Sequence, residues 1–167
     1  MRERLGRLSE PLPAVYPVVA AWLAVRPQAR RVAVFAALPG EPDLLPMVAA
    51  DRAREWCFPR VVGRERLVFH RVVDPQRELR VAAYGIREPL ATTAVVALDA
   101  IDVFFCPGLA FDGNGGRLGH GRGYYDRALA AARADARFVG VCFRCQRVAD
   151  THAVAHDVRM HEVLSEP

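Results

Sequence analysis

The chain has 167 residues, of which 52% are hydrophobic and 25% are charged. This composition is typical of one compact domain with a substantial core, and it excludes disordered, collagen-like and small disulfide-stabilised proteins. All 23 basic residues are arginine, since the sequence contains no lysine, and the formal net charge is +4. Schiff-base lysine chemistry and lysine-dependent phosphate loops are therefore excluded, whereas an anionic ligand is permitted.

The first part of the chain predicts a helix, a strand and a second helix in succession. A helix is expected from Pro17 to about Val25, because proline suits a first turn and apolar residues follow at helical spacing. Residues 31–37 are typical of a buried strand, and a Pro39-Gly40 turn leads from it into a helix from about Pro42 to Arg54. This order indicates a βα unit.

The rest of the chain continues the alternation. We expect strands at residues 56–62 and 67–73, separated by Gly63, and a core strand at residues 101–106, while residues 93–98 are ambiguous. A helix over residues 124–134 and a strand over residues 138–143 complete the pattern. These elements predict an α/β fold, in which a single domain over residues 1–167 has three α/β/α layers and a mostly parallel sheet flanked by helices.

The cysteines and the apolar segment near the N-terminus indicate in which cellular compartment the protein is expected. The four cysteines lie near Phe or Trp in apolar surroundings, and no signal sequence precedes them, so we expect a cytoplasmic protein. The apolar stretch from Leu12 to Val25 contains Pro13 and Pro17 and is shorter than the ~20 residues of a spanning helix, so no membrane anchor is expected.

A glycine-rich segment between a strand and a helix is the strongest candidate for a binding site. Six glycines lie from Gly113 to Gly123, where backbone amides can approach an anion, and Arg117 and Arg122 can supply cations. Asp126 could cap the following helix or hold Mg²⁺ against phosphates. The alternative is a tight surface loop with a capping aspartate.

The same segment resembles a known family signature. Pro107-Gly-Leu-Ala-Phe-Asp112, followed by Arg117-Leu-Gly-His-Gly-Arg-Gly-Tyr-Tyr-Asp126, is similar to the signature of the 5-formyltetrahydrofolate cyclo-ligase family, also called methenyltetrahydrofolate synthetases. The flanking motifs that agree in order are Leu38-Pro-Gly-Glu41, Phe58-Pro-Arg-Val, Gly85-Ile-Arg-Glu-Pro89, Phe143 with Gln146, His156-Asp157 and Glu162-Val-Leu. The resemblance covers the chain from about Arg31 onward and covers residues 1–30, an N-terminal arm and helix, only weakly.

The resemblance implies a reaction and its co-substrate. It implies a ligase of folate one-carbon metabolism that closes 5-formyltetrahydrofolate to 5,10-methenyltetrahydrofolate, with ATP and Mg²⁺ as cofactors and release of ADP and phosphate. The formyl oxygen would attack the γ-phosphorus, and N10 would then attack the activated carbon. Alignment and charge neutralisation are the main demands on such an enzyme.

The resemblance also implies roles for individual residues. It assigns ATP binding to Gly119, His120, Gly121, Arg122, Gly123, Tyr124 and Tyr125, and Arg2 and Arg4 are expected to substitute for the cations of the family's N-terminal arm. It assigns catalysis to Arg117, Arg122 and Tyr124, folate binding to Glu41, His120 and Tyr124, and metal binding to Asp126 and Asp157. Family members usually begin with a longer lysine-containing arm, so Arg2 and Arg4 are expected to take its place and to bind ATP less tightly.

Other classes of function remain as alternatives. One is a non-catalytic folate- or nucleotide-binding paralogue, and another is an RNA-binding protein on the same scaffold, although the arginines are dispersed among acidic residues. Cys142 and Cys145, with His152, His156 and His161, suggest a zinc site. Residues three apart on a strand point to opposite faces, however, so buried structural cysteines are favoured.

Overall fold

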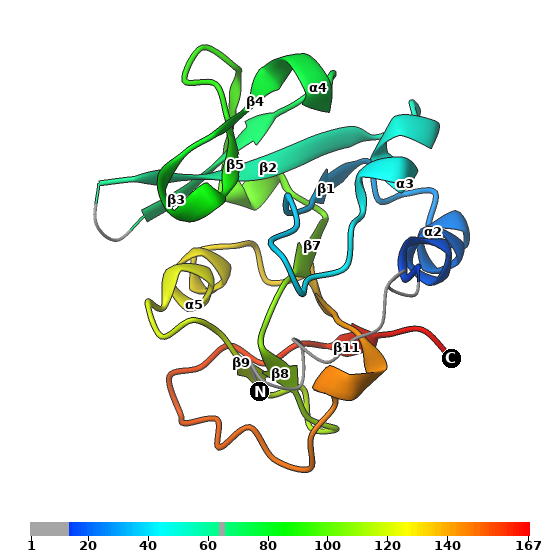
Figure 1. Cartoon of the computed structure of the whole chain (residues 1–167), viewed down its shortest axis with the longest axis vertical. Coiled ribbons are helices and arrows are strands. Elements are labelled where there is room, and N and C mark those ends of the chain that lie inside the picture. Colours follow the sequence, from blue (N-terminus) through cyan, green and yellow to red (C-terminus); the bar gives the residue numbers. More distant parts are fainter. Residues whose placement is uncertain (1–13, 64–65) are drawn as a thin grey trace.

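The computed structural model describes residues 14–63 and 66–167 and shows an α/β arrangement (Figure 1). The α-helices are α2 (Tyr16–Ala24), α3 (Leu45–Ala50), α4 (Pro75–Glu78) and α5 (Tyr124–Ala130). Short 3₁₀ turns cover Ala83–Gly85, Leu98–Ala100 and Arg144–Gln146. The strands are β1 (Arg31–Ala33), β2 (Glu55–Val62), β3 (Arg66–Arg71), β4 (Leu79–Val81), β5 (Arg87–Pro89), β6 (Val95–Val96), β7 (Val103–Cys106), β8 (Ala110–Phe111), β9 (Arg117–Leu118), β10 (Arg137–Val141) and β11 (Glu162–Leu164).

A seven-stranded sheet in the order β11-β10-β7-β1-β2-β3-β6 forms the centre of the protein. The pairs from β11 across to β2 are parallel, while β3 pairs antiparallel with both β2 and β6. Helices α2 and α3 cover one face of this sheet, and α5 covers the other (Figure 1). The expected three-layer α/β fold with a mostly parallel sheet is confirmed.

The order of strands reverses direction between β1 and β7. From β1 the chain continues to β2 on one side, and from β7 it continues to β10 and β11 on the other side. The segments that leave the carboxyl ends of β1 and β7 therefore diverge to opposite faces, toward α3 and α5 respectively. In open α/β sheets such a reversal leaves room for a ligand beyond the strand ends.

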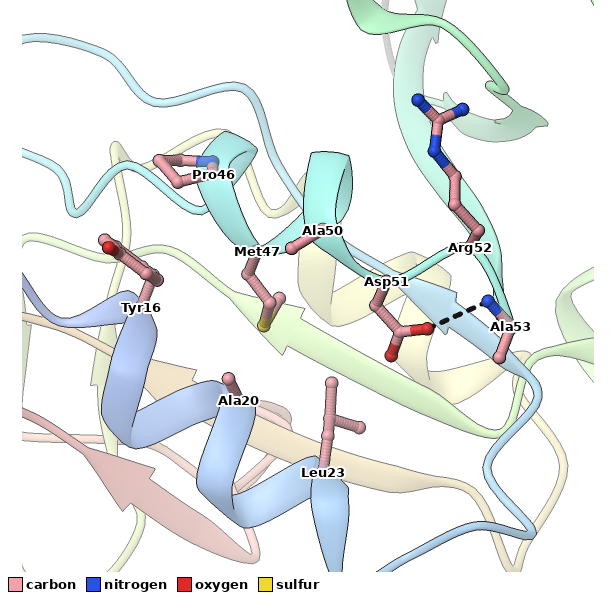
Figure 2. Close-up of a pocket in the computed structure, with 9 residues that line it drawn as sticks. All are labelled: Tyr16, Ala20, Leu23, Pro46, Met47, Ala50, Asp51, Arg52 and Ala53. Atoms are coloured by element: carbon pink, nitrogen blue, oxygen red, sulfur yellow. Dashed lines mark hydrogen bonds between the residues drawn. The ribbon is translucent and has the colours of Figure 1, made fainter.

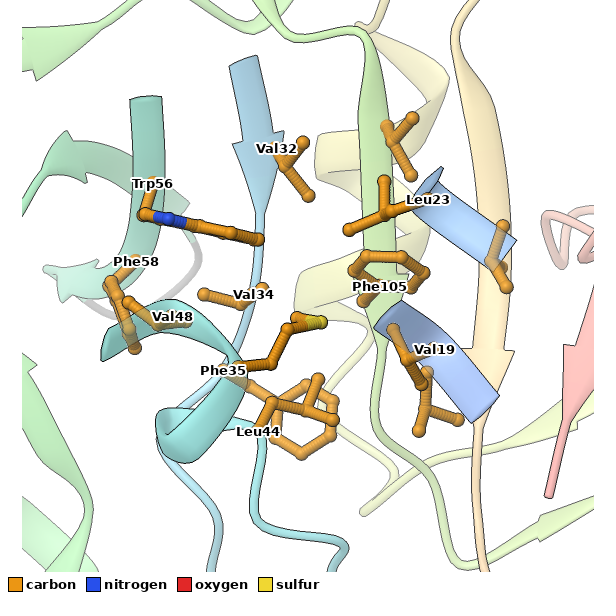
Figure 3. Close-up of a cluster of buried hydrophobic side chains, with 14 of the residues drawn as sticks. Val19, Leu23, Val32, Val34, Phe35, Leu44, Val48, Trp56, Phe58 and Phe105 are labelled. Atoms are coloured by element: carbon orange, nitrogen blue, oxygen red, sulfur yellow. The ribbon is translucent and has the colours of Figure 1, made fainter. Parts of the chain in front are cut away.

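The larger part of the core lies between the sheet and helices α2 and α3 (Figure 3). Val19 and Leu23 of α2 and Val48 of α3 are buried against the sheet. The Trp22 ring meets Phe105 of β7 edge-on, with 5.7 Å between the ring centroids. Burial of such side chains supplies about 1.5–3 kcal/mol each, which is the principal force holding these helices on the sheet.

A second cluster fills the opposite face, beneath α5. Ala128 and Leu129 are the buried residues of that helix, and they pack in one cluster with Phe104 and Cys106 of β7. Phe104 contacts the Phe69 ring edge-on at 5.5 Å. Because Val103 and Phe105 face the other cluster, β7 is buried on both faces, as its continuous apolar sequence predicts.

Helix α2 is fastened to the far edge of the sheet through polar contacts. The indole Nε1 of Trp22 donates to Oε2 of Glu162 in β11 at 2.8 Å. The Arg26 guanidinium stacks on the same indole, with its Cζ 3.7 Å from the ring centroid, and lies 3.6 Å from the Glu162 carboxylate. The predicted helix from Pro17 to about Val25 is confirmed to within one residue, with Pro17 in its first turn.

Several predicted elements are shorter in the structure. The helix expected from Pro42 to Arg54 is only Leu45–Ala50. Pro46 lacks an N–H and therefore lies in the first turn, and the backbone is already extended at Asp51, with ψ 99°. The strand expected at residues 31–37 is only Arg31–Ala33, although Val34 still donates to the Cys57 carbonyl. The helix expected over residues 124–134 ends at Ala130. Within residues 14–63 and 66–167, no helix has the length and apolar character needed to cross a bilayer.

A substitution at Gly140 tests how tightly β10 packs against the Phe111 ring, which comes just before the glycine-rich segment. A Cβ at this position would lie 2.5 Å from Cε1 of the buried Phe111 ring. We expect Gly140→Ala to lower the free energy of unfolding by about 1–3 kcal/mol, because the ring must shift within a packed core. Urea denaturation of the purified variant measures this change.

Gly113→Ala is the matched control, since a Cβ there would meet nothing within 4 Å. Its stability should stay within about 0.5 kcal/mol of the wild type. Equal stabilities for the two alanine variants would contradict the packing described for Gly140.

Candidate active site

Two loops meet where the strand order reverses. One follows β1 and carries Glu41, and the other follows β7 and carries His120. Glu41 Oε1 lies 3.9 Å from His120 Nε2. This approach joins two segments that the sequence separates widely, and it defines the candidate site.

The loop after β1 holds the Glu41 side chain in a fixed position. Its backbone N–H donates to the Leu38 carbonyl at 2.9 Å, in a turn where Gly40 has a φ of 87°. The Leu38 N–H in turn donates to Glu41 Oε2 at 2.9 Å. Burial raises the pKa of Glu41, and the Leu38 bond opposes this effect. Oε1 is the oxygen that faces His120.

Asp112 shapes the glycine-rich segment between β8 and β9. Its Oδ1 accepts from the N–H groups of Asn114 at 2.8 Å and Gly116 at 2.9 Å. Its Oδ2 accepts from the N–H of Thr151 at 3.0 Å and from the Thr151 hydroxyl at 2.6 Å. Burial alone would raise the pKa of Asp112, but these hydrogen bonds outweigh it and hold the pKa at about 2.

Two glycines let the C-terminal segment approach this turn closely. Gly115 has a φ of 80°, and a Cβ there would collide with the Met160 backbone. The Met160 N–H donates to the Gly115 carbonyl at 2.8 Å. A Cβ on Gly116 would collide with the Thr151 hydroxyl and the Asp112 carboxylate. The loop therefore depends on residues 151–160 for its shape.

Arg117 and Asp126 form an ion pair at the base of the segment. Arg117 Nη2 lies 3.1 Å from each carboxylate oxygen of Asp126. The Arg117 side chain is 5% exposed and that of Asp126 is 20% exposed. The Arg117 Cζ also lies 5.3 Å from the centroid of the Tyr125 ring. The arginine is thus buried between a carboxylate and an aromatic face.

Tyr125 lies near titratable groups of both loops. Burial raises the pKa of its hydroxyl well above the usual value, and nearby Cys106 and Glu41 raise it further, while Arg117 lowers it. Burial also raises the pKa of the Cys106 thiol to about 12. Both groups are therefore protonated near neutral pH and add no charge to the site.

Other predicted residues that the structure describes lie along the same loop. Arg122 is exposed, and Gly121 and Gly123 on either side of it have φ values of 79° and 63°. Tyr124 begins α5 and is half-buried. The predicted ATP ligands Arg2 and Arg4 lie outside the described residues.

The aspartates predicted to bind metal have other partners. Asp126 is paired with Arg117, and its Oδ1 also accepts from the Val158 N–H at 3.4 Å. Asp157 Oδ2 accepts from the Val154 N–H at 2.9 Å. Across residues 14–63 and 66–167, no group of three His, Cys, Asp or Glu side chains is placed to hold a metal ion. This donor set does not fit a resident magnesium ion bound by protein ligands alone.

The residues of the zinc hypothesis are dispersed. Cys142 is buried, and burial raises its pKa to about 12. The His152 and His156 side chains are 88% and 85% exposed. All four cysteines are free.

Two hollows in the surface lie away from the meeting of the loops. A hollow of about 420 Å³ separates α2 from α3 and is lined by Tyr16, Leu23 and Met47 among others (Figure 2). A smaller one of about 240 Å³ lies against the Asp112 turn and the start of β11. Neither hollow is lined by Glu41 or His120. The candidate site is therefore defined by the approach of the two loops and not by either hollow.

The fold and the loops together define a class of protein: an open α/β protein with a candidate site at the reversal of its strand order. The chain matches the 5-formyltetrahydrofolate cyclo-ligase family over residues 19–166. It belongs to that family, which confirms the resemblance seen in the sequence.

Individual relatives agree with this assignment. The chain is 35% identical to the 5-formyltetrahydrofolate cyclo-ligase of Haemophilus influenzae over 92 residues, which span 54% of this chain and 49%, about half, of that relative. It is 33% identical to the Escherichia coli K12 cyclo-ligase over 143 residues, covering 82% of this chain and 78% of that protein. The NMR structure of Aquifex aeolicus 5,10-methenyltetrahydrofolate synthetase is 31% identical, with a TM-score of 0.82 over 98% of this chain and 84% of that one.

Sequence reasoning missed two features of the site. Asp112 appeared only as part of a motif, although the Asp-Gly-Asn-Gly-Gly sequence is typical of an aspartate that bonds the amides of its own turn. No local sequence pattern indicates the pairing of Arg117 with Asp126, because it joins β9, which pairs with β8, to helix α5.

Asp112 predicts a specific loss of stability in acid. Its pKa of about 2 in the folded protein lies below the unfolded value of about 3.9, so its stabilising contribution is present above pH ~4 and is lost as the pH falls through ~2. The contribution is about 2 kcal/mol. Asp112→Asn should be less stable at pH 7 and should lack this part of the acid dependence, as measured by urea unfolding between pH 2 and 7.

Asp99→Asn provides the control, because Asp99 is exposed. It should follow the wild-type curve. An Asp112→Asn protein with the same acid slope as the wild type would refute the assignment of that slope to Asp112.

Proposed function

We propose that this protein is an ATP-dependent 5-formyltetrahydrofolate cyclo-ligase that forms 5,10-methenyltetrahydrofolate and releases ADP and phosphate. Membership of the family supports the reaction class. The observation that carries the proposal is the approach of Glu41 to His120, which brings the family's Pro-Gly-Glu loop to its glycine- and arginine-rich loop at the strand reversal. A single site there can hold both substrates side by side.

Each loop has a role in this proposal. Glu41 binds the folate through its inward-facing carboxylate oxygen, and His120 and Tyr124 complete the folate contacts from the opposite loop. The ATP phosphates lie along residues 119–125, with Arg2 and Arg4 as further cations. The backbone of this segment is free of bulky side chains at Gly119, Gly121 and Gly123, so a polyphosphate can approach its amides.

The chemistry needs no protein nucleophile. The formyl oxygen attacks the γ-phosphorus and ADP departs; N10 then attacks the activated carbon, and the C–O bond breaks to release phosphate. Arg117, Arg122 and Tyr124 serve this step by neutralising charge on the transferred phosphoryl group in a preorganised setting. When bound with ATP, magnesium would neutralise charge on the phosphates, and Asp157 is the aspartate of the pair that forms no ion pair with an arginine within residues 14–63 and 66–167.

The setting proposed for this reaction is a reducing cytoplasm. The four free cysteines, three of them buried, are compatible with that compartment. Folate and ATP are the proposed small-molecule partners, with the whole chain acting as one cyclo-ligase domain.

Turnover of purified protein tests the proposed function directly. With 5-formyltetrahydrofolate, ATP and Mg²⁺, we expect the absorbance of methenyltetrahydrofolate to rise in step with the release of ADP. Binding of folate or ATP without any turnover would identify a non-catalytic paralogue instead. A salt-sensitive RNA complex, with no affinity for either small molecule, would indicate an RNA-binding protein.

Glu41→Gln isolates the folate contact. The substitution preserves shape and can keep the bond from Leu38, but it removes the charge from a largely buried acceptor. A hydrogen bond to a charged group contributes about 1.5–3 kcal/mol, so kcat/KM for 5-formyltetrahydrofolate should fall about ten- to a hundredfold, with the KM for ATP nearly unchanged. Steady-state kinetics with each substrate varied in turn measure both parameters.

Glu55→Gln is the comparison, since Glu55 pairs with Arg31 at the amino-terminal ends of β1 and β2, whereas the candidate site lies beyond the carboxyl ends of β1 and β7. It should leave both KM values unchanged. If Glu41→Gln weakened the use of ATP as much as that of 5-formyltetrahydrofolate, Glu41 would not be a residue of the folate subsite alone, and its assignment would be contradicted.

A further inference from the structure

The carboxylate of Asp126 is directed toward Arg117. Both of its oxygens lie 3.1 Å from Nη2 of that arginine, and Oδ1 also accepts from the Val158 N–H. These contacts come from β9 and from the C-terminal segment, so two parts of the chain converge on one carboxylate at the start of α5. The first candidate ligand for magnesium is therefore already bonded within the protein.

Arg117 requires this partner. Its side chain is 5% exposed, which leaves a permanent positive charge almost without solvent. A buried charge is retained only where an opposite charge and hydrogen bonds compensate it. Asp126 is the carboxylate with which Arg117 forms an ion pair among the described residues, and the neighbouring Tyr125 and Cys106 remain neutral.

The other nitrogens of the Arg117 guanidinium are not engaged by Asp126. Nε is buried and has no hydrogen-bond acceptor within residues 14–63 and 66–167. Nη1 lies on the side of Gly119, where a Cβ would come within 2.8 Å of it. Asp126 thus engages one terminal nitrogen and leaves the remaining donors directed away from itself, next to the loop proposed to bind the ATP phosphates.

We propose that Asp126 is a positioning residue that fixes the orientation of Arg117, and that it does not ligate magnesium. The inference rests on the proposed function, because the group that Arg117 would contact is a phosphate of ATP. Asp126 acts through Arg117 alone, and a magnesium ion bound with ATP would not use the Asp126 carboxylate as a ligand.

Variants in an Arg117→Gln background separate the two roles of Asp126. Arg117→Gln should lower kcat about 10²- to 10³-fold, as expected for the loss of one preorganised cation. If Asp126 acts only by orienting Arg117, its removal should have no further effect on kcat once Arg117 is absent. The double variant Arg117→Gln/Asp126→Asn should therefore match Arg117→Gln to within about twofold in kcat, since residues that act as one unit are non-additive. This comparison avoids an uncompensated buried arginine and so does not depend on the folding of Asp126→Asn.

A magnesium titration gives the second readout. The Mg²⁺ concentration for half-maximal rate at saturating ATP should be the same in the wild type, Arg117→Gln and the double variant. A metal ligand at position 126 predicts the opposite, namely a further loss of about tenfold or more in the double variant and a higher Mg²⁺ requirement. Either of those results would overturn the proposal.

The matched control is a second ion pair remote from the loops. Arg133 Nη2 bonds Asp102 Oδ1 at 2.6 Å, where Asp102 also accepts from the Arg30 and Arg31 N–H groups. Arg133→Gln and Asp102→Asn should lower thermal stability while leaving kcat and the Mg²⁺ requirement unchanged. This control separates a positioning effect from a general loss of stability.

The failure of the proposed function would be visible separately. A wild-type protein that binds ATP without turnover would refute the cyclo-ligase activity, and the same variants would then be compared by ATP affinity with Mg²⁺ and with EDTA. The proposal predicts that adding Asp126→Asn to Arg117→Gln changes neither affinity. A loss confined to the Mg²⁺ condition would overturn it, and a wild type that binds no ATP would refute both.

Discussion

The parallel pairing of β1 with β7 is the constraint on which the rest of the structure depends. Parallel strands are joined by crossovers of one hand, so strands added on either side of this pair send their helices to opposite faces. At the pair itself, the two departing loops remain uncovered at the strand ends. Glu41 and His120 approach each other because their loops leave the same edge of the sheet from neighbouring strands. The buried strand β7, packed on both faces, makes the pairing rigid.

Two carboxylates near these loops show how backbone geometry tunes charge. Burial raises the pKa of Glu41, which has a single backbone donor at Leu38. Asp112 is buried as well, yet donors from Asn114, Gly116 and Thr151 reverse the direction and hold its pKa at about 2. The number of donors aimed at the carboxylate, the Thr151 hydroxyl first among them for Asp112, decides the direction of the pKa shift. Asp112 is thereby a fixed anion that shapes the loop, whereas Glu41 keeps one oxygen facing the opposite loop.

The sequence predicts the layers of the fold well and the contacts of the site poorly, for physical reasons. The apolar runs that became β2, β7 and β10 are strong signals because burial on one or both faces demands them. The boundaries of α3 depended on Pro46, and the short strands β8, β9 and β11 have too few residues to show any period. The family motif brought Arg117 and Asp126 to attention individually. Their pairing depends on how β9 packs against α5, which local patterns do not encode.

The hydrogen bonds that Thr151 donates to Asp112 also determine when the glycine-rich segment can fold during synthesis. Asp112 and Thr151 are 39 positions apart, and the Gly115 carbonyl accepts from the Met160 N–H, which is also synthesised later. A nascent chain folds from its N-terminus, so β1, β2 and β7 can assemble while the partners of the glycine-rich segment have not yet been made. Until they emerge from the ribosome, that segment has the N–H donors of Asn114 and Gly116 but lacks those of Thr151 and Met160. The glycine-rich segment therefore takes its final shape late, although its residues are not among the last to be synthesised.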